Sequence, residues 1–121
     1  MGQYTDITIV VPSSAEVGTK VEVEVKVYNK WTGQLHLTVT GNADGIDLFF
    51  SNISMWVSPG QTISWYDSFI MPNKDVRLSV WSWFEAGDGQ WYADDGKYKD
   101  IDKTEPTPAT FKDLVCTYGR V

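Results

Sequence analysis

Acidic side chains gather around a run of aromatic residues in the second half of the chain. The segment Asp67–Gly96 reads DSFIMPNKDVRLSVWSWFEAGDGQWYADDG. The acids in or near its aromatic part are Glu85, Asp88, Asp94, Asp95 and Asp100. Two carboxylates beside tryptophans are typical of the active-site cleft of a glycosidase. Several carboxylates in one flexible loop are the ligands that calcium prefers. Glycoside hydrolysis and calcium binding are therefore the two chemistries to weigh first.

Neither chemistry is favoured by the surrounding sequence. A glycosidase cleft needs a concave scaffold, which a chain of 121 residues with its acids in turns does not supply. Asp88, Asp94 and Asp95 converge if this segment folds into a hairpin, but their order fits no EF-hand loop. Asp-Gly pairs are also common simply because turns favour them. We therefore expect no catalytic residue, no metal site and no cofactor, with calcium at the acidic turn left open as the alternative.

Histidine and cysteine are too few for other catalytic or metal sites. Hydrolysis by a Ser-His-acid group needs a histidine base, and the only histidine is His36, opposite the apolar face of a predicted strand with no nucleophile motif nearby. We expect it to be a surface residue. Cys116 is the only cysteine, so no internal disulfide forms, and it is expected to be a buried thiol. One of each is too few for a typical zinc site. The sequence predicts a protein that is not an enzyme.

The aromatic run is best explained as a β-hairpin. Val76–Phe84 alternates in polarity, which predicts a strand with Val80 and Phe84 on one face and the neighbouring tryptophans on the other. Glu85–Gln90 is rich in Gly and Asp and predicts a turn, after which Trp91-Tyr92 begins a returning strand.

The six tryptophans are the sharpest feature of the sequence. Trp65 is in phase with Ile63 and Phe69 and is expected in the core. The predicted binding residues are Trp81, Trp83, Trp91 and Tyr92. Sugar rings stack on exposed aromatic side chains, and protein interfaces favour Trp and Tyr as anchors. The alternative is that these four residues pair across strands and cover the end of the molecule.

The rest of the chain is expected to form short strands between turns. The clearest is KVEVEVKVYN, in which four valines alternate with polar residues. Further strands are predicted at Tyr4–Val11, from Leu35 to Thr40, and at Ile46–Phe50, Ile53–Val57 and Thr62–Met71. Gly41–Gly45 is expected to break the strand from Leu35 to Thr40, with Ile46–Phe50 crossing between sheets. Ser58–Gln61 is a turn signal, because Pro presets the first turn dihedral and Gly takes the position that needs positive φ.

This spacing of strands and turns predicts an all-β fold, an antiparallel β-sandwich of seven to nine strands. Residues 1–103 are expected to form the sandwich, and residues 104–121 a Pro-containing linker and a C-terminal strand. The linker prediction, Lys103–Ala109, follows from its prolines, since residues before Pro avoid the helical region. The chain is long enough for one domain and too short for two cores.

The charge of the chain limits its partners. The formal net charge is −6 and no basic cluster is present, so nucleic acid is not expected as a partner. No segment has the apolar length of a membrane span, so no membrane insertion is expected. The N-terminus lacks a basic region followed by an apolar run, so no signal peptide is expected.

Two short motifs carry a resemblance to a known class of module. VGTKVEVEVKVYN, followed downstream by VSPGQT, resembles the immunoglobulin-like modules of the cell-adhesion-related (CARDB-like) class found in surface and virion proteins. The resemblance covers roughly the first hundred residues, whereas VWSWFEAGDGQWYADDG departs from the usual return strands. It implies an immunoglobulin-like fold and a non-enzymatic module that spaces or binds.

Taken together, these features favour a structural or assembly module that acts through protein–protein contacts. We expect partners to be other protein subunits, in a homo-oligomer or a larger assembly, and the location to be a virion or the cell surface. The alternative function is a carbohydrate-binding module that uses the aromatic platform on a glycan.

Overall fold

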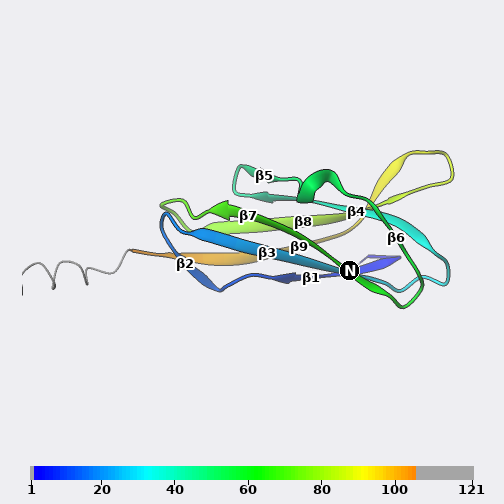
Figure 1. Ribbon diagram of the computed structural model, residues 1–121, viewed down its shortest axis with the longest axis horizontal. Helices are drawn as coiled ribbons and strands as arrows, with labels where there is room; N and C mark the ends of the chain where they lie inside the picture. The colour runs from blue at the N-terminus through cyan, green and yellow to red at the C-terminus, as the bar shows by residue number, and fades with distance from the viewer. Residues whose placement is uncertain (1, 106–121) are drawn as a thin grey trace, which may run out of the picture.

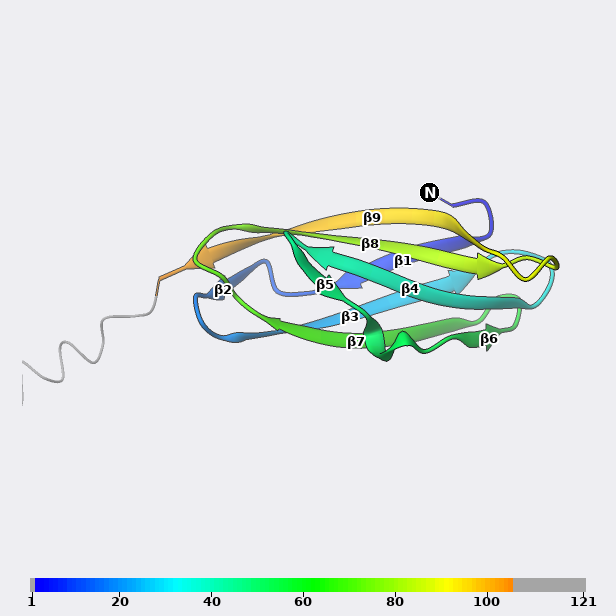
Figure 2. The same ribbon diagram turned by 90° about the horizontal axis from the view of Figure 1, so that it is seen from above.

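The computed structural model describes residues 2–105, which form nine strands and one short 3-10 helix in two stacked sheets (Figures 1 and 2). The elements are β1 (Thr5–Val10), β2 (Ser14–Glu16), β3 (Lys20–Asn29), β4 (Leu35–Ala43), β5 (Ile46–Leu48), η1 (Phe50–Asn52), β6 (Met55–Val57), β7 (Thr62–Ile70), β8 (Val76–Glu85) and β9 (Trp91–Thr104). The predicted all-β sandwich is confirmed.

One sheet has three strands in the order β1-β3-β7, and the other has six. In the larger sheet the order is β2-β9-β8-β4-β5, with β6 pairing with a different part of β4. All pairs are antiparallel except β2 with β9. β1 is an edge strand, as its proline-bounded end predicted.

The core lies between the two sheets. Alternate residues of each strand point into it, because successive side chains of a strand point to opposite faces. Val21, Val23, Val25 and Val27 of β3 are all at most 1% exposed, facing apolar residues of β4, β8 and β9. Trp65 of β7 is 3% exposed, so its predicted core position is confirmed. At about 25 cal/mol per Å² of apolar area, these residues supply the main stabilisation of the sandwich.

The region after β4 differs from the prediction. β4 continues through Gly41 to Ala43, and a two-residue Asp44-Gly45 turn with positive φ at both positions (54° and 100°) leads into β5. Such a turn matches the twist of a tight hairpin. β5 therefore pairs with β4 in the same sheet, and the prediction of a strand crossing between sheets at Ile46–Phe50 was wrong. Gly41 is needed where Phe50 and β8 approach closely, since an added Cβ would lie 3.2 Å from the Phe50 ring.

Several turns follow the sequence. At Ser58–Gln61 the Gln61 N–H donates to the Ser58 carbonyl at 3.0 Å, and Gly60 has a φ of 78°. The β8–β9 turn lies between Glu85 and Trp91, as predicted. The segment before β3 contains β2, which adds to the edge of β9.

β9 runs to Thr104, beyond the predicted start of the linker at Lys103. The rest of the linker, the strand predicted at Phe111–Val121 and Cys116 lie outside the described residues. Within residues 2–105, no helix has the length and apolar character needed to cross a membrane.

Candidate functional site

A β-bulge in the β8–β9 hairpin contains Asp94 and Asp95 and determines which way their side chains point. Trp81 pairs with Gly96 and Trp83 pairs with Ala93, so the single residue Ser82 lies opposite two residues of β9. Two residues opposite one is the definition of a bulge. The buried Ser82 hydroxyl accepts a hydrogen bond from the backbone N–H of the second of these two, Asp95, at 3.0 Å. The two acids in the bulge, Asp94 and Asp95, both hydrogen-bond to the N-terminal part of the chain at β1.

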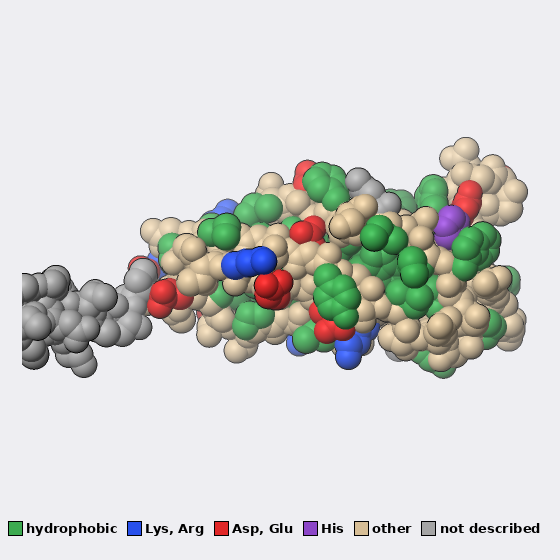
Figure 3. All heavy atoms as spheres, in the orientation of Figure 1, with side chains coloured by type: hydrophobic (Ala, Val, Ile, Leu, Met, Phe, Trp, Pro, Cys, Tyr) green, Lys and Arg blue, Asp and Glu red, His purple; other side chains and the backbone are tan. Residues whose placement is uncertain are grey.

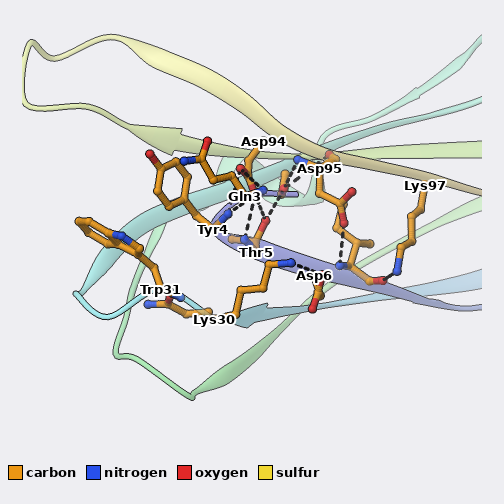
Figure 4. Close-up of polar contacts among 12 residues, drawn as sticks. Gln3, Tyr4, Thr5, Asp6, Lys30, Trp31, Asp94, Asp95 and Lys97 are labelled. Carbon is orange, nitrogen blue, oxygen red and sulfur yellow. Dashed lines mark hydrogen bonds and ion pairs between the residues drawn. The ribbon is translucent and has the colours of Figure 1, made fainter. Parts of the chain in front are cut away.

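Asp94 binds the start of β1 through its carboxylate (Figure 4). Its Oδ1 accepts from the backbone N–H of Gln3 at 3.0 Å and of Tyr4 at 3.2 Å. Its Oδ2 accepts from the N–H of Thr5 at 2.9 Å and from the Thr5 hydroxyl at 2.5 Å. Hydrogen bonds to a charged acceptor contribute about 1.5–3 kcal/mol each. One side chain therefore joins the two sheets at their edge.

Asp95 also binds β1, at Ile7, two residues after the Thr5 that Asp94 binds. Its carboxylate, 3% exposed as a residue, accepts from the backbone N–H of Ile7 at 3.1 Å. The Lys97 ammonium donates to the Ile7 carbonyl at 2.7 Å. We call Asp94, Asp95 and Lys97 the edge clip, because they bind the edge of β1 that β3 leaves open (Figure 4).

The edge clip separates two of the three acids considered for calcium from the third. Asp94 and Asp95 point toward β1, whereas Asp88 lies in the β8–β9 turn and accepts from Gln90 N–H and the Tyr92 hydroxyl, both at 2.9 Å. The three acids considered for calcium therefore do not converge. No group of three or more His, Cys, Asp or Glu residues within 2–105 is arranged to hold a metal ion.

Asp88 and Asp100 of the hairpin are solvent-exposed. The Arg77 guanidinium hydrogen-bonds to Asp100 at 2.9 and 3.2 Å and lowers the pKa of that carboxyl. The backbone N–H of Gln90, followed by the Tyr92 hydroxyl, lowers the pKa of Asp88. The same contact with Asp88 raises the pKa of Tyr92. These are surface interactions of the hairpin.

The outward face of the six-stranded sheet carries most of the predicted binding residues. Trp81, Trp83 and Trp91 share this face, because Trp83 pairs with Ala93 and Glu85 with Trp91 across the hairpin. Trp56 joins them from β6, where it pairs with His36 of β4. We call these four tryptophans the aromatic face. Trp81, Trp91 and Trp56 are 40%, 37% and 61% exposed.

Tyr92 does not belong to the aromatic face. It pairs with Phe84, on the other side of the sheet, and their ring centroids lie 5.9 Å apart. The predicted platform of four residues is therefore divided: three lie together, and Tyr92 lies at the end of the sandwich. Strand alternation separates Trp91 from Tyr92, since adjacent residues of a strand point to opposite faces.

Two contacts fix the orientation of the central tryptophans. The pyrrole edge of Trp81 covers Gly96, where an added Cβ would lie 2.9 Å from Trp81 Cδ1. The Trp83 indole N–H donates to the Thr40 hydroxyl of β4 at 2.9 Å. Both rings are thus held by the sheet while part of their surface faces solvent.

An open groove of about 730 Å³ lies along this face. Its aromatic wall is formed by Trp81 and Trp83, and its polar wall includes Thr40, Asn42 and Asp47. The Asn42 amide donates to Asp47 at 2.9 Å, which links β4 to β5. A second groove of about 340 Å³, lined by Trp83, Trp91 and Ser54 among others, lies on the other side of Trp83. The face offers flat rings beside hydrogen-bonding side chains.

His36 faces outward, as predicted, but it has more partners than the sequence indicated. Its Nδ1 lies 2.6 Å from Glu85 Oε1, and its Nε2 lies 2.9 Å from the Ser54 hydroxyl. The ring stacks on Trp56 with centroids 4.5 Å apart. Figure 3 shows the histidine beside hydrophobic side chains near one end of the molecule.

The order Ser54–His36–Glu85 matches that of a Ser-His-acid group. Acyl transfer, however, depends on oriented donors in a site from which water is excluded. Ser54 is exposed at the surface, in the segment before β6. In this structure the two hydrogen bonds hold the His36 ring between Glu85 and Ser54, where it stacks on Trp56.

Sequence reasoning placed His36 at the surface but did not join it or Trp56 to the predicted binding residues. Each lies opposite the apolar residues of its own strand, which was visible in the alternation. Their pairing depends on β6 joining β4, and no local pattern specifies that register.

Comparison with solved structures shows what this sandwich is similar to. No protein-family model and no curated protein sequence matches the chain. The CARDB domain of a Pyrococcus furiosus protein, solved in complex with di-metal ions, matches with a TM-score of 0.61 and 14% identity, over 85% of this chain and 91% of that one. Native α2-macroglobulin of Escherichia coli matches with a TM-score of 0.65 and 16% identity, over 84% of this chain and 7% of that one.

A chain from the human seminal-plasma complex of zinc α2-glycoprotein and prolactin-inducible protein also matches, with a TM-score of 0.56 and 7% identity, over 86% of this chain and 97% of that one. At such identities the similarity concerns the fold. The resemblance drawn from VGTKVEVEVKVYN and VSPGQT is confirmed at that level: the chain has an immunoglobulin-like β-sandwich fold similar to that of CARDB and macroglobulin domains.

Proposed function

We propose that this chain is a non-catalytic structural module that assembles with other protein subunits through its aromatic face, as a component of a virion or a surface appendage would. The observation that supports this most directly is the exposure of Trp56, Trp81 and Trp91 on one side of the six-stranded sheet. Large exposed apolar patches on soluble proteins mark contact surfaces.

The composition of this surface fits a protein interface. Tryptophan is enriched among the residues that dominate binding energy, because a large rigid ring is buried at little entropic cost. Phe49 and Ile53, 57% and 48% exposed, lie in the connection from β5 to β6 and extend the apolar area. The surface is therefore broader than one ligand pocket.

Charge places a condition on self-association. Two copies with a formal net charge of −6 each repel one another at low ionic strength. The aromatic face itself carries few charges, and Arg77 and Asp100 at its far end neutralise each other. We therefore expect association to strengthen with added salt, because screening weakens the repulsion while apolar burial remains.

Light scattering across a concentration series tests the proposal. We expect a closed oligomer for the wild type, and a monomer when Trp81 and Trp91 are both changed to Ala. Tyr66→Ala is the matched control, since Tyr66 is 65% exposed on β7 of the other sheet. A wild-type monomer at all concentrations, with no co-purifying partner that depends on Trp81, contradicts assembly through this face.

The groove beside Trp81 and Trp83 favours carbohydrate binding as a second candidate. Sugar recognition combines an aromatic ring, which stacks on the apolar face of the pyranose, with side chains that hydrogen-bond to hydroxyl groups. Thr40, Asn42 and Asp47 provide such groups along the same groove.

A glycan panel separates this candidate from assembly. We expect binding of a neutral glycan by the wild type and loss of that binding in Trp83→Ala, with Tyr98→Ala as a control for an exposed aromatic residue outside the groove. Unchanged glycan affinity in Trp83→Ala contradicts the use of this groove.

A further inference from the structure

A second concave site lies at the end of the sandwich, apart from the groove beside Trp81. It has a volume of about 250 Å³, and its lining includes Tyr4, Trp31, His36, Trp56, Phe84 and Glu85. We call it the end pocket. Its walls come from the residue before β1, the β3–β4 turn, β4, β6 and β8. Four separate stretches of the chain, around residues 4, 31–36, 56 and 84–87, therefore meet around one small space.

The rings of the end pocket are held in place by the fold. Asn29, which is fully buried, accepts from the Trp31 N–H at 2.9 Å and donates its amide to the carbonyls of Gly33 and Val57. Tyr4 lies edge-on to Trp31, with centroids 5.4 Å apart, and to Phe84, with centroids 5.0 Å apart. The pocket is thus formed without a ligand, and binding needs little ordering of these side chains.

One acidic group lines this aromatic space. Glu85 hydrogen-bonds through Oε1 to His36, and no other described side chain hydrogen-bonds to its carboxylate. No lysine or arginine lines the pocket within residues 2–105. The Glu85 side chain is 33% exposed, so its charge is partly removed from water. When the His36 ring is neutral, Glu85 is the one charged side chain among the described residues that lines the pocket, and the electrostatic field there favours a cation.

We propose that the end pocket binds a methylated ammonium group. The negative faces of aromatic rings attract cations, and rings that surround a quaternary ammonium while a carboxylate balances its charge are the known way to bind this group. The methyl groups match the apolar walls, and the small volume suits a group of a few heavy atoms better than an extended ligand. The end pocket shares Trp56 with the aromatic face, but this inference does not rest on the proposed function.

The same group occurs in two kinds of molecule. A free quaternary amine carries it, and so does a methylated lysine side chain of a partner protein. Because Ala86 and the exposed Gly87 of the β8–β9 turn line the pocket, it lies at the surface, and either molecule can present the group.

The test is a titration followed by NMR of the tryptophan indole N–H signals. Tetramethylammonium is the cationic probe, and neopentyl alcohol, which has the same branched shape without the charge, is the neutral one. We expect tetramethylammonium to shift the Trp31 and Trp56 signals at lower concentration than neopentyl alcohol, and to leave the Trp81 signal unchanged. Equal effects of the two probes, or shifts that centre on Trp81, overturn the proposal.

Substitutions then test the residues. Glu85→Gln keeps the size of the side chain and is expected to weaken tetramethylammonium binding roughly 3- to 30-fold. Asp88→Asn is the matched control, because it removes a charge from the same hairpin outside the pocket and should leave affinity unchanged. Trp31→Ala provides a second test that leaves the Glu85–His36 contact in place, with a similar loss expected. Unchanged affinity in both Glu85→Gln and Trp31→Ala overturns the proposal.

Binding of a methylated peptide and binding of the free cation are compared to identify which kind of molecule carries the group. A peptide with one trimethyllysine that binds more tightly than free tetramethylammonium, while its unmethylated form does not bind, indicates a protein partner. Equal affinities for the peptide and the free cation indicate a small-molecule ligand. Glu85→Gln is repeated in both arms, so that binding elsewhere on the chain counts against the end pocket.

Discussion

The edge clip and the aromatic face belong to the same β8–β9 hairpin but use their side chains in opposite ways. Asp94 accepts hydrogen bonds from the backbone N–H groups of Gln3, Tyr4 and Thr5, where the chain enters the first strand, so its carboxylate is already hydrogen-bonded within the fold. Trp81 and Trp91 keep about two-fifths of their surface in solvent, at 40% and 37% exposed. Residue type alone therefore does not identify a binding or catalytic site. What matters is whether the fold already satisfies the group.

The largest expected effect is on the edge clip. Asp94→Ala leaves the N–H groups of Gln3, Tyr4 and Thr5 without their acceptor, so we expect it to lower the free energy of unfolding by about 3 kcal/mol. Urea denaturation followed by tryptophan fluorescence measures this loss.

Asp88→Ala is the control for that experiment. It removes an acid from the exposed turn of the same hairpin, where surface substitutions change stability by about 0.5 kcal/mol or less. If Asp94→Ala and Asp88→Ala are equally stable, the contrast between a structural and an exposed acid fails.

A smaller effect is expected where β9 supports the aromatic face. Gly96→Ala places a Cβ at 2.9 Å from Trp81 Cδ1, so the indole must move away from β9. Because the ring is exposed and can turn, we expect a loss of about 1 kcal/mol in stability. The clearer signal is a shift of the Trp81 indole N–H resonance. An unchanged resonance would show that Gly96 does not hold the ring.

The smallest effect is a pH dependence at the tip of the hairpin. Gln90 N–H and the Tyr92 hydroxyl lower the pKa of Asp88 in the folded state, so this stabilisation is present above the ordinary Asp pKa of about 3.9 and is lost as pH falls through the lowered value. The pKa of Tyr92 is raised, so its contribution is present below about 10 and is lost as pH rises through the raised value.

Titration of Tyr92 by NMR in the wild type and in Asp88→Asn measures this contact. We expect the pKa of Tyr92 to fall toward its ordinary value in the variant, because the negative acceptor has gone. The same Tyr92 pKa in both proteins would contradict a contact between the two side chains in solution.

Local patterns predicted the strands well where one face is apolar. KVEVEVKVYN matches β3 residue for residue, because alternation alone decides which side of such a strand is buried. Gly41 misled the prediction: it permits close packing within β4, and the turn comes three residues later.

The candidate site was harder to predict because it depends on pairing between distant segments. The bulge that redirects Asp94 and Asp95 exists only once β8 and β9 are in register. The contact of Trp56 with His36 likewise depends on β6 meeting β4. Alternation places a side chain on a face, but it does not say which face a neighbouring strand will cover.

The edge clip also sets the order in which the chain can mature. Thr5 and Asp94 are separated by 89 residues, so a nascent chain leaves the ribosome with the outer amides of its first strand bound only to water until nearly the whole sandwich has been synthesised. Closing so long a loop is slow and comes late in folding. Chains that end before Trp91 are therefore expected to expose this strand edge to other polypeptides. Formation of the final hairpin is then the step that protects the domain from aggregation through β1.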